Sequence, residues 1–219
     1  MHLFARPELK LGAVGHRLNQ LPEAARPRIR DTIGRLLGVI EEIGEAAGAG
    51  RFTMLSALAE GTDRYGAEAA LARGWALEAP LPFSVKRYER DFGDKASVKE
   101  FRALMKAARK VHPHPENDAD DDAGYGGVGA FIAQHCHLLL AVWSGAAAKG
   151  PGGTGHVIAL ALAAGAPVLW LGVERNAPTR LLAPAKQNAR KHDLDRALRK
   201  ALAARFQTAE RPAELSVRL

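Results

Sequence analysis

The 219-residue sequence has one cysteine, Cys136, and aromatic residues make up only 6% of it. A single cysteine cannot form a disulfide within the chain, which excludes a disulfide-stapled fold and agrees with a reducing compartment. Cys136 lies in an apolar stretch, where a buried, unreactive thiol is expected rather than a nucleophile. Its neighbours His135 and His137 would point in different directions on a helix, so no metal site is predicted here.

Long apolar runs are also missing. No uninterrupted run approaches the ~20 apolar residues that a membrane-spanning helix needs, which argues against a membrane partner. The first residues show neither the apolar core nor the small-residue cleavage site of a secretory signal. We therefore expect a cytoplasmic protein.

An excess of one charge is confined to one end of the chain. The formal net charge is +7. Residues 1–174 hold twenty basic and twenty acidic side chains, whereas residues 175–219 hold eleven basic and four acidic ones. Proteins that bind nucleic acid usually carry a basic patch over the folded surface. The balanced body of this chain therefore does not favour a nucleic-acid partner.

Short apolar segments alternate with helix-like segments through most of the chain. The predicted strands are residues 9–14, 52–58, 75–81, 137–143 and 166–171, and the predicted helices between them include residues 25–47, 65–73 and 156–165. In the first helix, isoleucines and leucines recur three and four positions apart, which marks one buried face. Strands and helices in this order form a parallel sheet covered on both faces. We predict an α/β fold, a Rossmann-like doubly wound parallel sheet.

The alternation lapses within the predicted domain of residues 1–174. Residues 82–124 are interpreted as an insertion or lid, with a helix at 98–108 and a further helix following at 125–134. The acidic run at 117–122 resembles half of a calcium loop but lacks the glycine and the closing glutamate of that motif. It is therefore predicted to be a solvated surface loop.

Residues 175–219 are predicted to form a basic, partly helical C-terminal tail. Apolar side chains lie one turn apart in it, at Leu194, Leu198, Leu202 and Phe206. Such a stripe is typical of a helix that packs on a core or on a second copy of the chain. The stripe is thus one candidate contact for a homo-oligomer.

A glycine-rich loop connects the strand at 137–143 to the helix at 156–165. Gly150, Gly152, Gly153 and Gly155 leave the main chain accessible to a ligand. A loop that leads into a helix start presents unpaired N–H groups and the positive end of the helix dipole, so the expected ligand is an anion. The loop matches neither the P-loop nor the dinucleotide fingerprint. A plain tight connection is the alternative.

Ligands of open α/β sheets bind beyond the carboxyl ends of the strands, where the strand order reverses. We expect the strands at 9–14 and 137–143 to be central neighbours, so that the loop at 15–17 faces the glycine-rich loop. The expected phosphate or ligand contacts at these ends are Gly15, His16, Arg17, Ser56, Gly61, Thr62, Gly152, Gly153, Thr154, Gly155 and His156.

Several of these side chains have a structural alternative. Arg17 either binds a phosphate through its guanidinium or pairs with Glu60 or Asp63 on the surface. Thr62 and Thr154 stand at helix starts, where N-capping is the ordinary role.

A set of motifs gives the chain a family resemblance. The segments SALAEGTDRYGAEAALARGWALEAPLPF, YERDF, YGGVG (Tyr125 to Gly129), LLLAVWSG and KGPGGTGHVIALALAAGAPVLWL occur in order between residues 9 and 173. Together they resemble the SLOG superfamily, which includes the LOG cytokinin-activating phosphoribohydrolases, the DNA-processing DprA proteins and many bacterial nucleotide-sensing domains. The resemblance implies a Rossmann-like domain that binds a nucleotide or a nucleotide-derived ligand at the glycine-rich loop.

One departure from the LOG pattern bears on activity. LOG enzymes carry PGGxGTxxE and cleave the bond between a base and ribose 5′-phosphate. The segment PGGTG at 151–155 matches the phosphate-binding half, but Ala159 stands at the position of the glutamate. Glycosidic cleavage requires a carboxylate near the anomeric carbon, and Glu60 and Asp63 are the candidate catalytic substitutes.

These observations favour a binding function, as a sensor or regulatory domain, over catalysis. The alternative is a LOG-type hydrolase of nucleoside 5′-monophosphates, and a second alternative is a DprA-like DNA-associated protein whose only support is the basic tail. The expected ligand is nucleotide-like, with Mg²⁺ as an accompanying ion and no required cofactor. The protein is expected to form a homo-oligomer.

Overall fold

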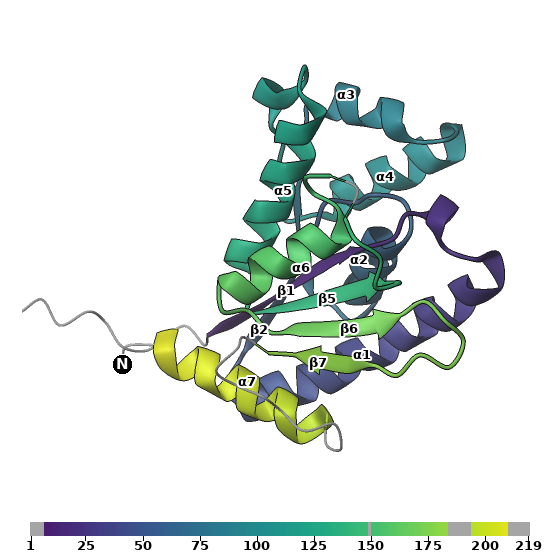
Figure 1. Cartoon of the computed structure of the whole chain (residues 1–219). Helices are drawn as coiled ribbons and strands as arrows, with labels where there is room; N and C mark the ends of the chain where they lie inside the picture. Colours follow the sequence, from purple (N-terminus) through teal and green to yellow (C-terminus); the bar gives the residue numbers. More distant parts are fainter. Residues whose placement is uncertain (1–6, 149, 184–193, 210–219) are drawn as a thin grey trace, which may run out of the picture.

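The computed structural model describes residues 7–148, 150–183 and 194–209. Its strands are β1 (Glu8–Gly15), β2 (Arg51–Ser56), β3 (Ala76–Pro80), β4 (Lys110–His112), β5 (Leu138–Trp143), β6 (Val168–Gly172) and β7 (Arg180–Leu182). They form one sheet in the order β4-β3-β2-β1-β5-β6-β7 (Figure 1). All neighbours pair in parallel except β6 and β7, which are antiparallel. The predicted parallel α/β sheet is confirmed.

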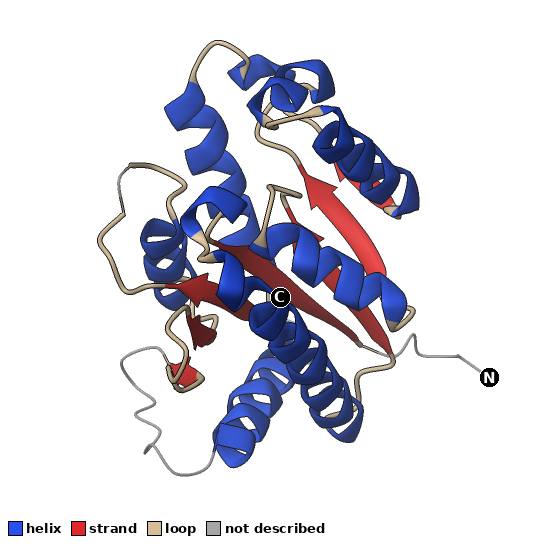
Figure 2. Ribbon diagram, turned by 90° about the vertical axis from the view of Figure 1, so that its right-hand side faces the viewer, coloured by secondary structure: helices blue, strands red, loops and turns tan. Residues whose placement is uncertain are grey.

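Helices cover both faces of this sheet (Figures 1 and 2). They are α1 (Arg26–Ala46), α2 (Thr62–Ala72), α3 (Val85–Tyr88), α4 (Lys95–Ala107), α5 (Asp121–His135), α6 (Thr154–Ala163) and α7 (Leu194–Ala209). Apolar residues of α1, α2, α4 and α7 share one core with the sheet, and those of α5 and α6 share the other. The fold is therefore Rossmann-like and doubly wound.

The alternation of side chains along β1 shows how one strand serves both cores. Leu9, Leu11 and Ala13 pack with α1 and α2, whereas Val14 packs with α5 and α6. Gly12 lies on the α5 side, where an added Cβ would stand 2.8 Å from Ile132 Cγ2. A glycine is needed at this position because α5 approaches the strand closely.

The strand order reverses beside β1. The chain runs from β1 through β2 and β3 to the edge strand β4, and then returns to β5 on the other side of β1. The residues predicted as first and fourth strands are thus neighbours, with Val14 opposite Ala141. The loops after β1 and β5 consequently leave the sheet side by side.

The acidic run at 117–122 was expected to be a solvated surface loop, and this prediction is confirmed in part: residues 119–122 are exposed, but the last two belong to α5. Asp120 is the N-cap of α5 and accepts a hydrogen bond from the Ala123 N–H at 3.0 Å, and Asp121 and Asp122 occupy the first helical turn. Asp118 accepts from the Ser84 N–H at 2.7 Å. Carboxylates are stabilising at a helix N-terminus, so the run starts a helix.

Two strands of three residues were not predicted. β4 lies within the expected insertion at 82–124 and forms one edge of the sheet, and β7 lies within the expected tail and forms the other edge. Three residues are too few for a period-two pattern to be visible in the sequence.

The helix predicted in the tail is present as α7, which contacts α1 and β7. Leu198 and Leu202 are buried in the core that α1 shares with the sheet. These two leucines are therefore not available as a surface for a second copy of the chain, and that part of the expected oligomer contact is wrong. In the described part of the chain, no helix is both long and apolar enough to span a membrane.

Candidate ligand-binding site

Two adjoining cavities lie beyond the carboxyl ends of β1 and β5. The first has a volume of about 270 Å³ and the second of about 90 Å³. Both are lined by Gly15, Arg17, Tyr125, Gly152 and Thr154, so the two form a continuous cleft. Its place is the one that the reversal of strand order predicts for a ligand.

The glycine-rich loop forms one wall of the first cavity. Gly152 has φ +75°, and an added Cβ would lie 2.3 Å from the Tyr125 carbonyl oxygen, so only glycine fits. The Gly152 N–H donates to His156 Nδ1 at 3.1 Å, and the Gly153 N–H donates to the Gly150 carbonyl at 3.2 Å. These two bonds hold the turn that leads into α6.

The start of α6 carries no side-chain cap. Gly153 is the N-cap residue and has no side chain to accept from the first-turn N–H groups, which have no carbonyl partner in an α-helix. Thr154 and Gly155 line the first cavity at this helix start. The helix therefore presents backbone donors and the positive end of its dipole to the cleft.

The loop after β1 forms the opposite wall and is braced on two sides. His16 Nε2 accepts from the Ser144 N–H at 3.0 Å, and His16 Nδ1 lies 3.1 Å from Gln20 Oε1. Burial lowers the pKa of His16, so the neutral ring donates from Nδ1 to Gln20. The His16 carbonyl accepts from Thr62 Oγ1 at 3.1 Å. His16 thus lines the cavity on a fixed backbone.

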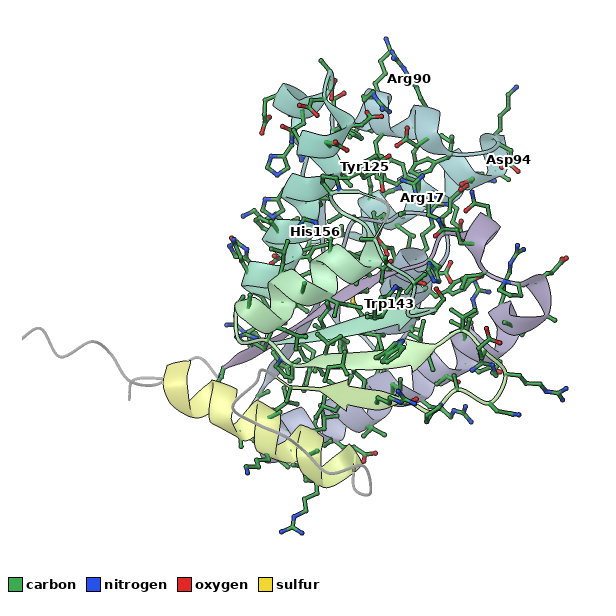
Figure 3. All side chains as sticks on the ribbon, in the orientation of Figure 1. Arg17, Arg90, Asp94, Tyr125, Trp143 and His156 are labelled. Carbon is green, nitrogen blue, oxygen red and sulfur yellow. The ribbon has the colours of Figure 1, made fainter. Side chains whose placement is uncertain are left out.

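Arg17 supplies the cation of the cleft. Its Nη2 donates to Tyr125 Oη at 3.0 Å, and its guanidinium carbon lies 5.3 Å from the Tyr125 ring centre. Tyr125 is itself hydrogen-bonded to Asp91. Within the described residues Arg17 forms no ion pair, so its other N–H groups are free to bind a ligand. Figure 3 labels Arg17 and Tyr125, which come from different elements.

Asp63 lines the second cavity and is only 6% exposed. Burial raises the pKa of this carboxyl to about 7, against the opposing effects of the Arg17 charge, a hydrogen bond from the Ala59 N–H and the Arg64 charge. A raised pKa follows from the loss of hydration of the charged form. Asp63 can therefore hold or release a proton near neutral pH.

Other predicted site residues line neither cavity and brace the structure instead. Ser56 Oγ donates to the Asp63 carbonyl at 2.9 Å, and Thr62 donates to His16. Gly61 has φ +94°, and an added Cβ would lie 2.7 Å from the His16 carbonyl oxygen. Direct contacts with a ligand were expected from four residues that do not line the cleft: Ser56, Gly61, Thr62 and His156.

Glu60 is also placed away from the cleft. Its carboxylate accepts from Ser97 Oγ and from the Gly93 N–H, which belong to the α4 side of the molecule. Glu60 precedes α2, which begins at Thr62, three residues earlier than expected. Of the two carboxylates named as catalytic candidates, the structure brings only Asp63 to the cleft.

Sequence reasoning missed three aromatic residues that line the cleft: Tyr88, Tyr125 and Trp143. Trp143 ends β5, and its Nε1 donates to the Ala146 carbonyl at 2.9 Å, so the ring is fixed beside the loop (Figure 3). Its place at the carboxyl end of a central strand was a usable signal. Tyr125 begins a segment that contributes to the family resemblance, but nothing in the sequence predicted that its side chain reaches the cleft from α5.

A mostly parallel sheet with helices on both faces and a cleft at the reversal of strand order defines a Rossmann-like α/β protein. Scans against protein-family models and against curated proteins find no match. Among solved structures, the X-ray structure of DNA processing protein A (DprA) from Streptococcus pneumoniae is similar with a TM-score of 0.48 and 14% identity. The alignment covers 92% of this chain and 56% of the DprA chain, so this chain spans little more than half of that protein.

Proposed function

We propose that the cleft binds a nucleotide or a nucleotide-derived ligand, with a phosphate group held between the start of α6 and Arg17. The observation that carries this proposal is the composition of the first cavity. The uncapped backbone N–H groups at the start of α6 and one guanidinium converge on it, and none of the described residues that line it is a carboxylate. A cavity with donors and a cation but no acidic group favours an anion.

The remaining walls of the first cavity suit the rest of a nucleotide. The Trp143 ring offers an aromatic surface, and residues 146–148 are alanines. Aromatic rings stack on bases of any kind. Mg²⁺ would enter only with the phosphates of the ligand, because this cavity offers it no carboxylate. The proposal agrees with the resemblance to the SLOG superfamily, and the role it implies is that of a sensor or regulatory domain.

Binding measurements test this proposal directly. Thermal-shift and calorimetric titrations would use AMP, ADP-ribose and a cyclic dinucleotide. At least one compound is expected to stabilise the wild type, and Arg17→Ala is expected to weaken its binding roughly tenfold or more. Arg90→Ala is the matched control, since Arg90 is an exposed arginine outside both cavities. Equal binding by Arg17→Ala and the wild type would refute the proposed site.

Asp63 favours N-glycosidic hydrolysis as a second candidate function. A carboxyl with a pKa of about 7 that lines the cleft is suited to general acid catalysis. Ala159, which replaces the LOG glutamate, is exposed and lines neither cavity. Incubation with nucleoside 5′-monophosphates should then release free base, and Asp63→Asn should abolish the release. If the nucleotides stay intact after prolonged incubation, hydrolysis is rejected and ligand binding is the proposed function that stands.

A further inference from the structure

The second cavity has a different chemistry from the first. Its volume of about 90 Å³ is a third of that of the first cavity. Aliphatic side chains form a large part of its walls, among them Val14, Val128 and Val157. Its polar side chains include one carboxyl, that of Asp63, and the hydroxyl of Tyr88, which is 1% exposed. The cavity therefore takes a small group that is partly apolar and partly hydrogen-bonding.

The charges around this cavity disfavour ionic occupants when Asp63 is ionised. An anion would meet the Asp63 carboxyl, and a cation would meet the Arg17 guanidinium, which lines the same cavity. An uncharged group with O–H donors avoids both conflicts. A carboxylate has only acceptor oxygens, and a hydroxyl of the ligand satisfies one of them. Burial of a polar group is favourable only with such a partner.

The position of the second cavity says which part of a phosphate ligand reaches it. Gly152 and Thr154 belong to the proposed phosphate site and also line the second cavity. The occupant is consequently the group bonded next to the phosphate. In a nucleotide this group is the sugar. The base is farther from the phosphate, and the larger first cavity, which contains Trp143, has room for it.

We infer that the second cavity is the sugar subsite of the cleft, in which Asp63 accepts a hydrogen bond from a hydroxyl of a pentose 5-phosphate unit. This inference rests on the proposed function. It makes Asp63 a residue that sets ligand specificity, because phosphate alone and a sugar phosphate share the first cavity but only the sugar reaches the carboxyl.

Calorimetric titration of two probes tests the subsite. Inorganic phosphate has the anion alone, and ribose 5-phosphate adds the sugar without a base. We expect the wild type to bind ribose 5-phosphate roughly tenfold more tightly than inorganic phosphate, as a hydrogen bond to a charged group would give. In Asp63→Ala this ratio should fall to within about twofold. The ratio is the readout, because the loss of a negative charge changes the affinity for both probes.

Control variants separate the two proposals. Asp31→Ala removes an exposed carboxylate of α1 and should leave the ratio as in the wild type. Asp63→Asn serves if Asp63→Ala does not fold. It keeps one acceptor oxygen, for the Ala59 N–H, and replaces the second carboxylate oxygen with an NH2 donor, so its ratio should also fall. Equal affinities of the wild type for inorganic phosphate and for ribose 5-phosphate would overturn the sugar subsite alone. A preference for ribose 5-phosphate that survives in both Asp63 variants would do the same. Failure of the wild type to bind either probe would overturn the proposed function, and the subsite with it.

Discussion

Two corners of the sheet look alike in the sequence and differ in the structure. The β2–α2 corner and the β5–α6 corner each lead from a buried parallel strand into a helix. Each contains a glycine with positive φ that is pressed against a neighbouring carbonyl, Gly61 at 2.7 Å from His16 O and Gly152 at 2.3 Å from Tyr125 O, measured from an added Cβ. Close packing of glycine is therefore common to both corners.

The difference lies in what surrounds each glycine. At the β2–α2 corner the space beside the glycine is filled by side chains, since Ser56, Thr62 and Arg64 are all buried and hydrogen-bonded. Only the second cavity opens at this corner, beside Asp63. At the β5–α6 corner the described residues between strand and helix are small or exposed, and the cleft opens beside them. A glycine-bearing turn thus indicates a ligand loop only where no side chain fills the space beside it.

The largest expected effect is a difference in stability between variants of two arginines, Arg64 at the β2–α2 corner and Arg17 in the cleft. Arg64 is 2% exposed and donates to the Leu58 carbonyl at 3.0 Å and to Glu100 at 2.6 Å. Removing it leaves the buried Leu58 carbonyl unpaired and a cavity in place of the side chain, so Arg64→Ala should lower the free energy of unfolding by about 3–5 kcal/mol. Arg17→Ala should change it by less than about 1 kcal/mol while it weakens ligand binding. Urea denaturation of both variants makes the comparison, and equal losses would contradict it.

The second prediction concerns the pH dependence that Asp63 gives to stability. Its pKa is about 7 in the folded protein against an ordinary 3.8, so between these values the unfolded chain releases a proton that the folded protein keeps. Stability should therefore fall as pH rises from about 4 to 7, by up to about 4 kcal/mol. Asp63→Asn removes this decline. It should match the wild type near pH 4 and exceed it in stability at pH 8.

Unfolding curves at a series of pH values check this prediction. The difference between variant and wild type is the useful quantity, because other carboxylates titrate equally in both. A difference that stays constant from pH 4 to 8 would show that Asp63 is not buried as described.

The smallest effect distinguishes two threonines at helix starts. Thr62 is fully buried and donates to the His16 carbonyl, so Thr62→Val should cost about 1–2 kcal/mol of stability. Thr154 lines both cavities and has no hydrogen bond from its hydroxyl within the described residues, so Thr154→Val should change stability by less than about 0.5 kcal/mol. It should instead weaken phosphate binding several-fold, measured by calorimetry. A larger loss of stability in Thr154→Val than in Thr62→Val, with phosphate binding unchanged in Thr154→Val, would contradict the comparison.

The sheet could be predicted from the sequence because its central strands are apolar runs with helices between them. The buried face of α1, with Ile29, Ile33, Leu37, Ile40 and Ile43 spaced by three and four, is a direct example. That β1 and β5 are adjacent in the sheet could be predicted because the chain was expected to cross to the other side of the sheet after its third strand. The short edge strands carry no such pattern and could not be found.

The candidate site could be predicted only in part. The glycine-rich loop and Arg17 were expected at the cleft because they follow central strands. The placement of Glu60 could not be predicted, since its partners Gly93 and Ser97 lie more than thirty residues further along the chain. The approach of Tyr125 to Gly152 joins segments that are distant along the chain, and no local pattern reports such a contact.

The central claim is that the β5–α6 corner, and not the β2–α2 corner, holds the phosphate. An NMR titration of the ¹⁵N-labelled protein with AMP measures both corners at once through their backbone amides. We predict the largest chemical-shift changes at Thr154 and Gly155, with smaller changes at Gly61 and Thr62, which precede Asp63 of the proposed sugar subsite. Saturating AMP that leaves Thr154 and Gly155 unshifted, or shifts confined to Gly61 and Thr62, would contradict the account.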